Sequence, residues 1–267
     1  MQTELSFSIV FTQTVNFIRN RFWSIALISL LLNIVSSLIL KNTVDPVIIT
    51  QLFQAKSPSA FPLFLKMLLI KLVLFIIIDS ILIAVIYNYS VNNYLNLNTV
   101  LSRMLPNVLN MIGFELIFLI ILPIIFLFAG LIFMILGLIV PKALVVFLFA
   151  VVAIVFAIFF NAIYYNFCGL IAQPTTKTFF EKFAECNRSI LTHWRFALPM
   201  MLIYFLVVFV ISLFNTLDNN IFLSVIYSTL LTILNIFTIC FFYRLNMLLT
   251  SNKSTLEPPE QNNSLII

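Results

Sequence analysis

Six stretches of the chain are apolar over about the length that an α-helix needs to cross a lipid bilayer, and this feature constrains the fold most. Roughly 20 residues span a hydrocarbon core of about 30 Å at about 1.5 Å per residue. The six predicted spans are residues 22–40, 67–87, 112–136, 143–165, 197–215 and 221–243.

None of these stretches alternates between apolar and polar residues as a membrane-spanning β-strand does. In lipid, a single segment satisfies all of its backbone polar groups only as a helix. The sequence therefore predicts an all-α fold, a polytopic transmembrane helical bundle of about six spans.

The composition excludes a water-soluble globular protein. Of the 267 residues, 63% are hydrophobic and 9% are charged, and the mean hydropathy is +1.16. Soluble domains carry about 25% charged residues, and a soluble fold of this size cannot bury so much apolar surface. The net charge of +5 does not indicate nucleic-acid binding, because the cations are scattered between the apolar stretches. We expect the lipid bilayer as partner and no nucleic acid.

We interpret residues 1–249 as a single integral membrane domain and residues 250–267 as a disordered polar tail, because the tail is polar and contains adjacent prolines. Within the domain, the stretch 112–171 holds either two full spans or one span and a re-entrant segment. Pro141 and Lys142 interrupt it. Proline disfavours helix for the preceding residue and lysine favours the membrane interface, so we expect a tight turn between two spans.

The segment 179–195, FFEKFAECNRSILTHWR, predicts an amphipathic helix between two spans. Thr178 and Glu181 have the spacing of a capping box, in which each side chain bonds the backbone N–H of the other residue. Apolar residues share one face of the expected helix: Phe179, Phe180, Phe183, Cys186, Ile190, Leu191 and Trp194. With cations on the other face, this pattern is typical of a helix lying along the membrane interface.

Segments 6–21 and 92–109 are weaker versions of the same pattern. The chain is therefore interpretable as three copies of an interfacial helix followed by a helical hairpin, at a spacing of roughly 85–95 residues. The sequence similarity behind this repeat is short, since it consists of NRFW at 20–23 and HWRF at 193–196. A true repeat and a chance similarity are both open.

The distribution of cations predicts the orientation in the membrane. With a cytoplasmic N-terminus and six spans, nine of the fourteen Lys and Arg residues lie on the cytoplasmic side and five on the other. This bias agrees with the positive-inside rule, so we expect both termini to be cytoplasmic. The N-terminus lacks the pattern of a cleaved signal peptide, and we expect none to be removed.

Signatures of catalysis and of metal binding are missing from the sequence. It contains no GxxxxGK[ST] phosphate-binding loop and no GxSxG nucleophile elbow, and its single histidine excludes an HExxH zinc site. The three cysteines have no metal-ligand spacing. We therefore expect a protein that is not an enzyme and has no catalytic residues, cofactor or metal.

One carboxylate lies in the middle of the second predicted span, in the sequence LFIIIDSILIAV at 74–85. A charged side chain at mid-bilayer costs about 2.5–3.5 kcal/mol on insertion scales. We therefore expect Asp79 to face the bundle interior, where it either accepts hydrogen bonds or is protonated. Lys71 is too far for an ion pair, at about 12 Å along the helix. The expected donors lie on other helices, namely the hydroxyls of the last span, Asn33 and Asn161.

A polar stripe follows one face of the last predicted span through Ser224, Ser228, Thr232 and Asn235. Together with the second span, it defines a candidate intramembrane polar site: Asp79, Ser80, Ser228, Thr232 and Asn235. One interpretation is a polar lining for a solute or proton path. The other is a set of interhelical hydrogen bonds of roughly 0.6 kcal/mol each, and the stripe, Asn33 and Asn161 favour this second role.

Three motifs resemble the YciC-like family of bacterial inner-membrane proteins: NFIRNRFWSIALISLLLN at 16–33, LTHWRFALP at 191–199 and FYRLNMLL at 242–249. The resemblance implies a multi-pass protein of the inner membrane and carries over no catalytic residue. The leading hypothesis is a structural or accessory membrane protein that binds lipid or an unidentified membrane-protein partner. The alternative is a small-solute or ion transporter or channel with a polar path past Asp79, and a membrane enzyme is a third possibility.

Overall fold

The computed structural model describes residues 5–43, 60–92, 94–215 and 221–254, which are almost entirely helical and contain no strand. The helices in these ranges are α1 (Phe7–Asn20), α2 (Phe22–Thr43), α4 (Ala60–Val91), α5 (Leu97–Ile139), α6 (Lys142–Ile171), α7 (Phe179–Thr192), α8 (Trp194–Asn215) and α9 (Ile221–Ser254). Six of them, α2, α4, α5, α6, α8 and α9, are long and apolar enough to cross a membrane. The all-α, polytopic fold class is confirmed. Residues 250–254 of the predicted tail belong to α9, and the rest of that tail, from residue 255, lies outside the described residues.

Each predicted span lies within one of these six helices, but the helices extend beyond the apolar windows. The window 67–87 belongs to α4, which has 32 residues, and the window 221–243 belongs to α9, which has 34. Hydropathy marks only the part of a helix that matches the hydrocarbon core. The backbone hydrogen bonds of the helix continue beyond the apolar part until a residue ends the helix.

The stretch 112–171 forms two separate helices, α5 and α6, each long and apolar enough to span a membrane. Val140 is the extended C-cap of α5, and Pro141 is the N-cap of α6. The tight turn that was predicted at Pro141 and Lys142 is confirmed.

The expectation of an interfacial helix at 92–109 is wrong. From Leu97 the helix α5 continues to Ile139 over 43 residues, a length of about 65 Å, and it passes through both Pro106 and Pro123. Elsewhere a single non-helical residue separates an amphipathic helix from the next span: Arg21 follows α1 and His193 follows α7. No such break interrupts α5, so its polar first turns and its span form one rod.

The amphipathic helix α7 ends at Thr192, three residues earlier than the predicted segment. Its capping box is confirmed, because the Thr178 hydroxyl accepts from the Glu181 N–H and the Glu181 carboxylate accepts from the Thr178 N–H. Cys186 and Ile190 are buried on its inner face.

Three residues of the predicted apolar face of α7 are not buried on that face. Phe180 and Leu191 are 74% and 69% exposed, because the apolar stripe is wider than the surface of α6 that it covers. Trp194 begins α8, and its ring packs 6.0 Å from that of Phe159 on α6.

The first and third parts of the chain have matching elements. Helices α1 and α7 both have 14 residues, α2 and α8 both have 22, and α4 and α9 have 32 and 34. The middle part consists of α5, in which the amphipathic element is fused to the span, and α6. The equal lengths support the interpretation of the chain as three related units.

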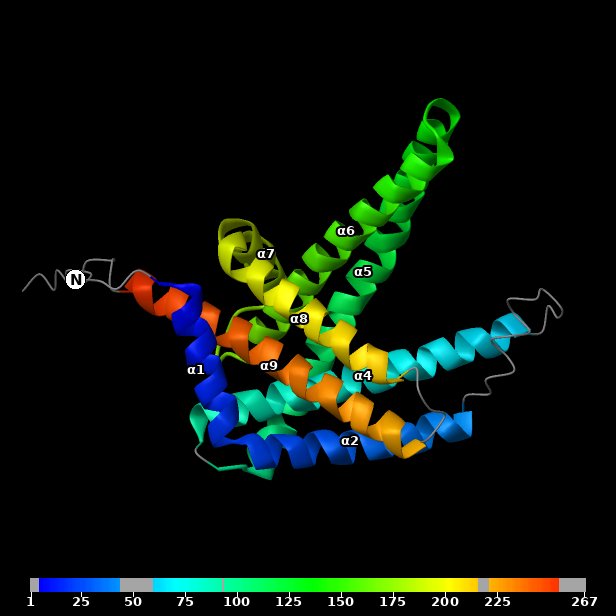
Figure 1. Cartoon of the computed structure of the whole chain (residues 1–267). Coiled ribbons are helices and arrows are strands. Elements are labelled where there is room, and N and C mark those ends of the chain that lie inside the picture. Colours follow the sequence, from blue (N-terminus) through cyan, green and yellow to red (C-terminus); the bar gives the residue numbers. More distant parts are fainter. Residues whose placement is uncertain (1–4, 44–59, 93, 216–220, 255–267) are drawn as a thin grey trace, which may run out of the picture.

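These units pack in a closed order (Figure 1). The amphipathic part of each unit lies on the last helix of another unit: α1 on α9, the first turns of α5 on α4, and α7 on α6. The helices α6 and α9 also pack closely on each other. This arrangement places the amphipathic elements around one end of the bundle, with α4, α6 and α9 between them.

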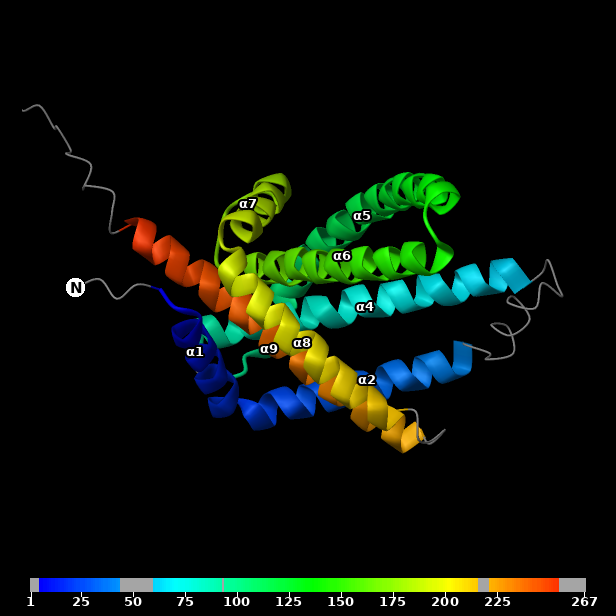
Figure 2. The same cartoon turned by 45° about the horizontal axis from the view of Figure 1, so that its top comes forward.

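The core lies at the end of the bundle that carries α1 and α7, and the helices diverge toward the other end (Figures 1 and 2). The far part of the α5–α6 hairpin stands apart from the other helices, and Leu138 and Ile139 at its turn are 83% and 78% exposed. The start of α1 and the end of α9 lie at the packed end in both views. The two described chain ends are therefore on the same side of the bundle.

Candidate functional site

Asp79 points into the bundle, as predicted, and is 2% exposed. It follows Ile76 and precedes Ile83 and Ile86 on the buried face of α4, a spacing that puts all four on one helix face. The hydroxyl of Tyr164, from α6, donates a hydrogen bond to the Asp79 carboxylate. Tyr164 is itself buried. This contact joins the second and fourth spans inside the membrane.

The donor to Asp79 is none of those that were expected. Asn33 donates to the Thr232 hydroxyl at 2.9 Å, and Asn161 donates to the Ala157 carbonyl of its own helix at 2.8 Å. The sequence analysis considered amides and aliphatic hydroxyls but no phenols. The pair Tyr164 and Tyr165 in the sequence AIYYNF at 162–167 was the signal that was missed, because a buried phenol needs a partner just as an amide does.

A pocket of about 300 Å³ lies beside this contact, between α4, α5, α6, α8 and α9. Its lining consists of Phe75, Glu115, Phe160, Asn161, Tyr164, Tyr165, Tyr204 and Asn235. We call it the tyrosine pocket. The hydroxyls of Tyr165 and Tyr204 donate to the Asn235 side-chain oxygen at 2.7 Å and 3.2 Å. Their rings lie 5.1 Å apart.

Glu115 gives the tyrosine pocket a carboxylate that is only half-buried. It lines the same pocket as Tyr164, whose hydroxyl donates to the Asp79 carboxylate. The pocket thus combines carboxylate and amide acceptors with phenol groups, between the rings of Phe75 and Phe160. Such a lining suits a hydroxyl or amine group attached to an apolar body.

Ser80 does not take part in this pocket. Its hydroxyl is buried without a hydrogen-bond partner in the described chain, and its carbonyl accepts from Asn107 of α5 at 3.2 Å. Ser80 lies against α5, so its contribution is a close helix contact.

The polar stripe of the last span is divided between two roles. Ser228 bonds back to carbonyls of its own helix, and Thr232 accepts from Asn33 and donates to the Ser228 carbonyl. Thr232 joins α2 to α9, as the interhelical interpretation predicts, whereas among the described residues Ser228 bonds only within α9. Asn235 alone reaches the tyrosine pocket, while Ser224 is exposed.

Buried asparagines form a second polar network that the sequence analysis did not identify. Asn246 of α9 donates to the Asn166 side chain of α6 at 2.8 Å, and Asn166 donates to the Cys186 carbonyl of α7 at 3.1 Å. In the first unit, Asn88 donates to the Tyr94 carbonyl at 2.9 Å. Asn88 thus holds the segment that follows α4, and Asn166 holds α7, which follows α6. Asn246 connects α9 to Asn166.

The electrostatics of α7 follow from its position outside the spans. Hydrogen bonds from Thr178 lower the pKa of the Glu181 carboxyl. Burial, with a smaller effect of the Arg103 charge, lowers the pKa of the Lys182 ammonium. Burial raises the pKa of the Cys186 thiol, so this cysteine stays a neutral packing residue.

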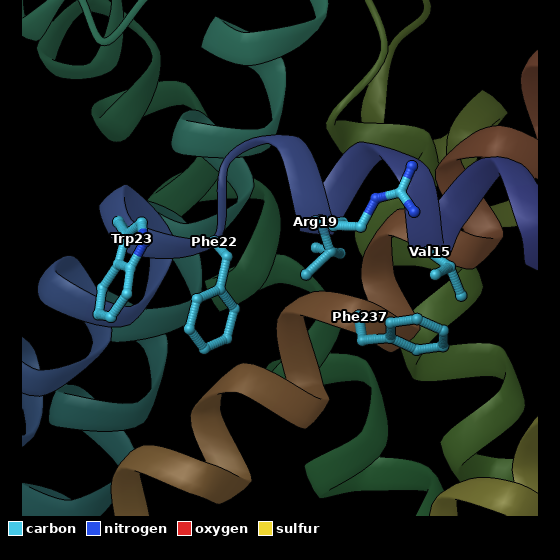
Figure 3. A pocket seen from close by; sticks show the side chains of 6 residues that line it. Val15, Arg19, Phe22, Trp23 and Phe237 are labelled. Atoms are coloured by element: carbon cyan, nitrogen blue, oxygen red, sulfur yellow. The ribbon is translucent and has the colours of Figure 1, made fainter.

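A second cavity, of about 450 Å³, opens at the corner between α1, α2 and α9 (Figure 3). Val15, Ile18, Phe22, Trp23 and Phe237 form its apolar surface, and Arg19 lies above the ring of Phe237 in the view. Trp23 is 83% exposed. An exposed indole at the start of a spanning helix is typical of a membrane interface.

The described residues contain no group of three or more His, Cys, Asp or Glu side chains that is placed to hold a metal ion. Comparison of the chain with protein-family models, with curated proteins and with solved structures finds no match.

Proposed function

We propose that this protein is a non-enzymatic accessory protein of the bacterial inner membrane that binds the polar group of a membrane amphiphile in the tyrosine pocket. The observation that carries the proposal is the half-buried carboxylate of Glu115 in a pocket of about 300 Å³ that lies among the spans. A partly desolvated carboxylate needs a hydrogen-bond donor. A lipid or other amphiphile with a hydroxyl or amine group supplies that donor from within the bilayer.

The pocket lining supports this ligand class. Phe75, which is 39% exposed, and the half-buried Phe160 offer aromatic surface for an apolar chain. Asn161 and Asn235 offer amide groups in the same lining. Apolar walls with a few convergent polar groups are the usual features of small-ligand sites.

A small-solute or ion transporter is the second candidate, and it is favoured by one observation. Asp79 accepts a hydrogen bond from Tyr164, which lines the same pocket as Glu115. Intramembrane acids next to a pocket are typical of ion and proton pathways.

The proposed orientation has both termini in the cytoplasm. Figure 1 shows α1 and α7 at the packed end, and most described cations lie in or next to these helices, in the first turns of α5 or in the later part of α9: Arg19, Arg21, Arg103, Lys177, Lys182, Arg188, Arg195 and Arg244. The other described cations are fewer and lie in the last turn of α2, the first part of α4 and the start of α6: Lys41, Lys66, Lys71 and Lys142. The positive-inside rule places the packed end in the cytoplasm. The resemblance to the YciC-like family supports the inner membrane as location.

Native mass spectrometry of the full-length protein released from its membrane tests the binding proposal. We expect co-purifying amphiphiles of one chemical class to be retained by the wild type and by Glu181→Gln, a matched control outside the spans. Glu115→Gln and Tyr204→Phe should lose them. Retention of the same ligands by both pocket variants would overturn the proposal.

Flux measurements in proteoliposomes distinguish the transporter from the accessory protein. The accessory role predicts no solute or proton flux above that of empty liposomes. A flux that Asp79→Asn abolishes would replace the first proposal by the transporter.

A further inference from the structure

Two arginines at the packed end converge on one aromatic ring. The guanidinium carbon of Arg21 lies 4.5 Å from the centroid of the Phe17 ring, and that of Arg244 lies 5.2 Å from the same centroid. Arg21 is the C-cap of α1 and Arg244 belongs to α9. Both are half-buried, and Phe17 is 4% exposed. The two positive charges are thus held near each other, partly out of water.

No acidic side chain of the described chain balances this pair. The four described acids are Asp79, Glu115, Glu181 and Glu185. Asp79 accepts from Tyr164, and Glu115 lines the tyrosine pocket. Glu181 belongs to the capping box of α7, and Glu185 pairs with Lys177 at 2.6 Å. The Lys177–Glu185 contact is the only ion pair among the described residues.

The hydrogen-bonding capacity of the two guanidiniums is also mostly unused. Arg21 donates to the Tyr89 carbonyl at 3.3 Å, whereas Arg244 donates no hydrogen bond within the described chain. The Nε atoms of both are buried without a partner. Stacking on Phe17, Tyr89 and Tyr243 covers the guanidinium faces but leaves the N–H donors unsatisfied. Buried donors and charges in native proteins almost always have partners.

We propose that Arg21 and Arg244 form a binding site for a phosphate group. Guanidinium groups bind phosphate through two parallel N–H···O bonds, and an anion here removes the repulsion between the two cations. The site lies where α1 meets the first span and where α4 ends, at the level of the membrane interface. It is separate from the tyrosine pocket and does not depend on the function proposed for that pocket.

Two sources of phosphate reach this position, a phospholipid headgroup and free phosphate in the cytoplasm. The cavity between α1, α2 and α9 favours the lipid, because two residues of its apolar surface, Ile18 and Phe22, directly follow Phe17 and Arg21 in the chain and offer a place for an acyl chain (Figure 3). Basic sites between spanning helices on the cytoplasmic side are typical of anionic-lipid recognition.

Thermal unfolding of the full-length protein in neutral detergent tests the site, with three probes titrated separately: short-chain phosphatidylglycerol, short-chain phosphatidylcholine and inorganic phosphate. We expect phosphatidylglycerol to raise the unfolding temperature more than phosphatidylcholine does. Arg244→Gln should weaken this binding by about tenfold, the effect of one lost charged hydrogen-bond donor. The control is Arg195→Gln, since Arg195 also stacks on a ring, that of Phe196 at 5.0 Å. It should bind like the wild type.

An equal Arg244-dependent shift with inorganic phosphate supports the site and assigns it to free phosphate. Three results overturn the proposal: equal stabilisation by phosphatidylcholine and phosphatidylglycerol, equal weakening in Arg195→Gln, or unchanged binding in Arg244→Gln. If Arg244→Gln does not fold, Arg244→Lys keeps the charge but not the two-pronged geometry. Weaker binding by Arg244→Lys supports the proposal, and unchanged binding contradicts it.

Discussion

One half of each of the helices α5 and α6 packs against other helices and the other half is exposed, although both halves are largely apolar. Phe114 and Phe167 are fully buried, whereas Leu138 and Ile139 are 83% and 78% exposed. The halves differ in their polar residues. From 116 to 160, Lys142 is the only side chain that carries a charge or a hydrogen-bonding group, while the buried half of α6 contains Tyr164, Tyr165 and Asn166. In a lipid solvent, polar side chains mark the interior better than hydrophobicity does.

The largest expected effect on stability comes from adding one methyl group to the packed half and, as a comparison, one to the exposed half. A Cβ atom at Gly169 would lie 2.7 Å from the Tyr243 backbone nitrogen, whereas one at Gly137 meets no atom within 4 Å. We expect Gly169→Ala to lower the free energy of unfolding by about 3 kcal/mol, the upper range for overpacking. Gly137→Ala should be neutral or stabilising by up to about 1 kcal/mol. Unfolding in mixed micelles measures both, and equal destabilisation would remove the distinction between the halves.

The next effect concerns Asp79 in the packed half. Asp79→Leu leaves the buried Tyr164 hydroxyl without its acceptor and should destabilise by about 1–3 kcal/mol. Asp79→Asn keeps an acceptor and the shape, so we expect it to retain most of the stability. The same unfolding assay compares the two variants. Equal loss in both would mean that the hydrogen bond is not what Asp79 contributes.

A smaller effect tests whether the packed end depends on α7. Thr178→Ala removes the N-cap hydroxyl and should cost about 1 kcal/mol, with no effect on the far part of the α5–α6 hairpin. Hydrogen exchange of the two regions provides the comparison. If Thr178→Ala increased exchange at the hairpin turn as much as in α7, the cap would not be acting on α7 alone.

The same cap has a defined pH dependence. Because hydrogen bonds from Thr178 lower the pKa of Glu181 in the folded protein, its contribution is present above the usual glutamate pKa. It is lost as the pH falls through the lower folded value. Glu181→Gln should therefore flatten the acid side of the exchange profile of α7. An unchanged acid profile would contradict this assignment.

The smallest effect concerns the contact between α2 and α9. Thr232→Val removes the acceptor for Asn33 and should cost roughly 0.6 kcal/mol, the average for such bonds in membrane helices. The control is Ser212→Ala, since Ser212 is half-buried and bonds only to its own helix, at the Phe209 carbonyl. A loss in Ser212→Ala as large as in Thr232→Val would show that the contact between helices is not what is measured.

The fold was predictable from the sequence because the length of each apolar stretch matches the bilayer. The amphipathic pattern did not predict the structure at 92–109, because it gives no sign that α5 lacks a break like the one at Arg21 or His193. The inward direction of Asp79 was predictable from the cost of a carboxylate in lipid. Its partner was not predicted: the phenols Tyr164 and Tyr165 were visible in the sequence as groups that need an acceptor, but which acceptor each one meets depends on how the helices pack.

The central claim is that the phenol–carboxylate contact between α4 and α6 organises the interior and positions the tyrosine pocket. A double-mutant cycle of Asp79→Asn and Tyr164→Phe, with the free energy of unfolding measured for all four proteins, tests it most directly. The account predicts a coupling of about 1 kcal/mol or more, within the range found for strong hydrogen bonds between membrane helices. Additive effects, within about 0.3–0.5 kcal/mol, would contradict it.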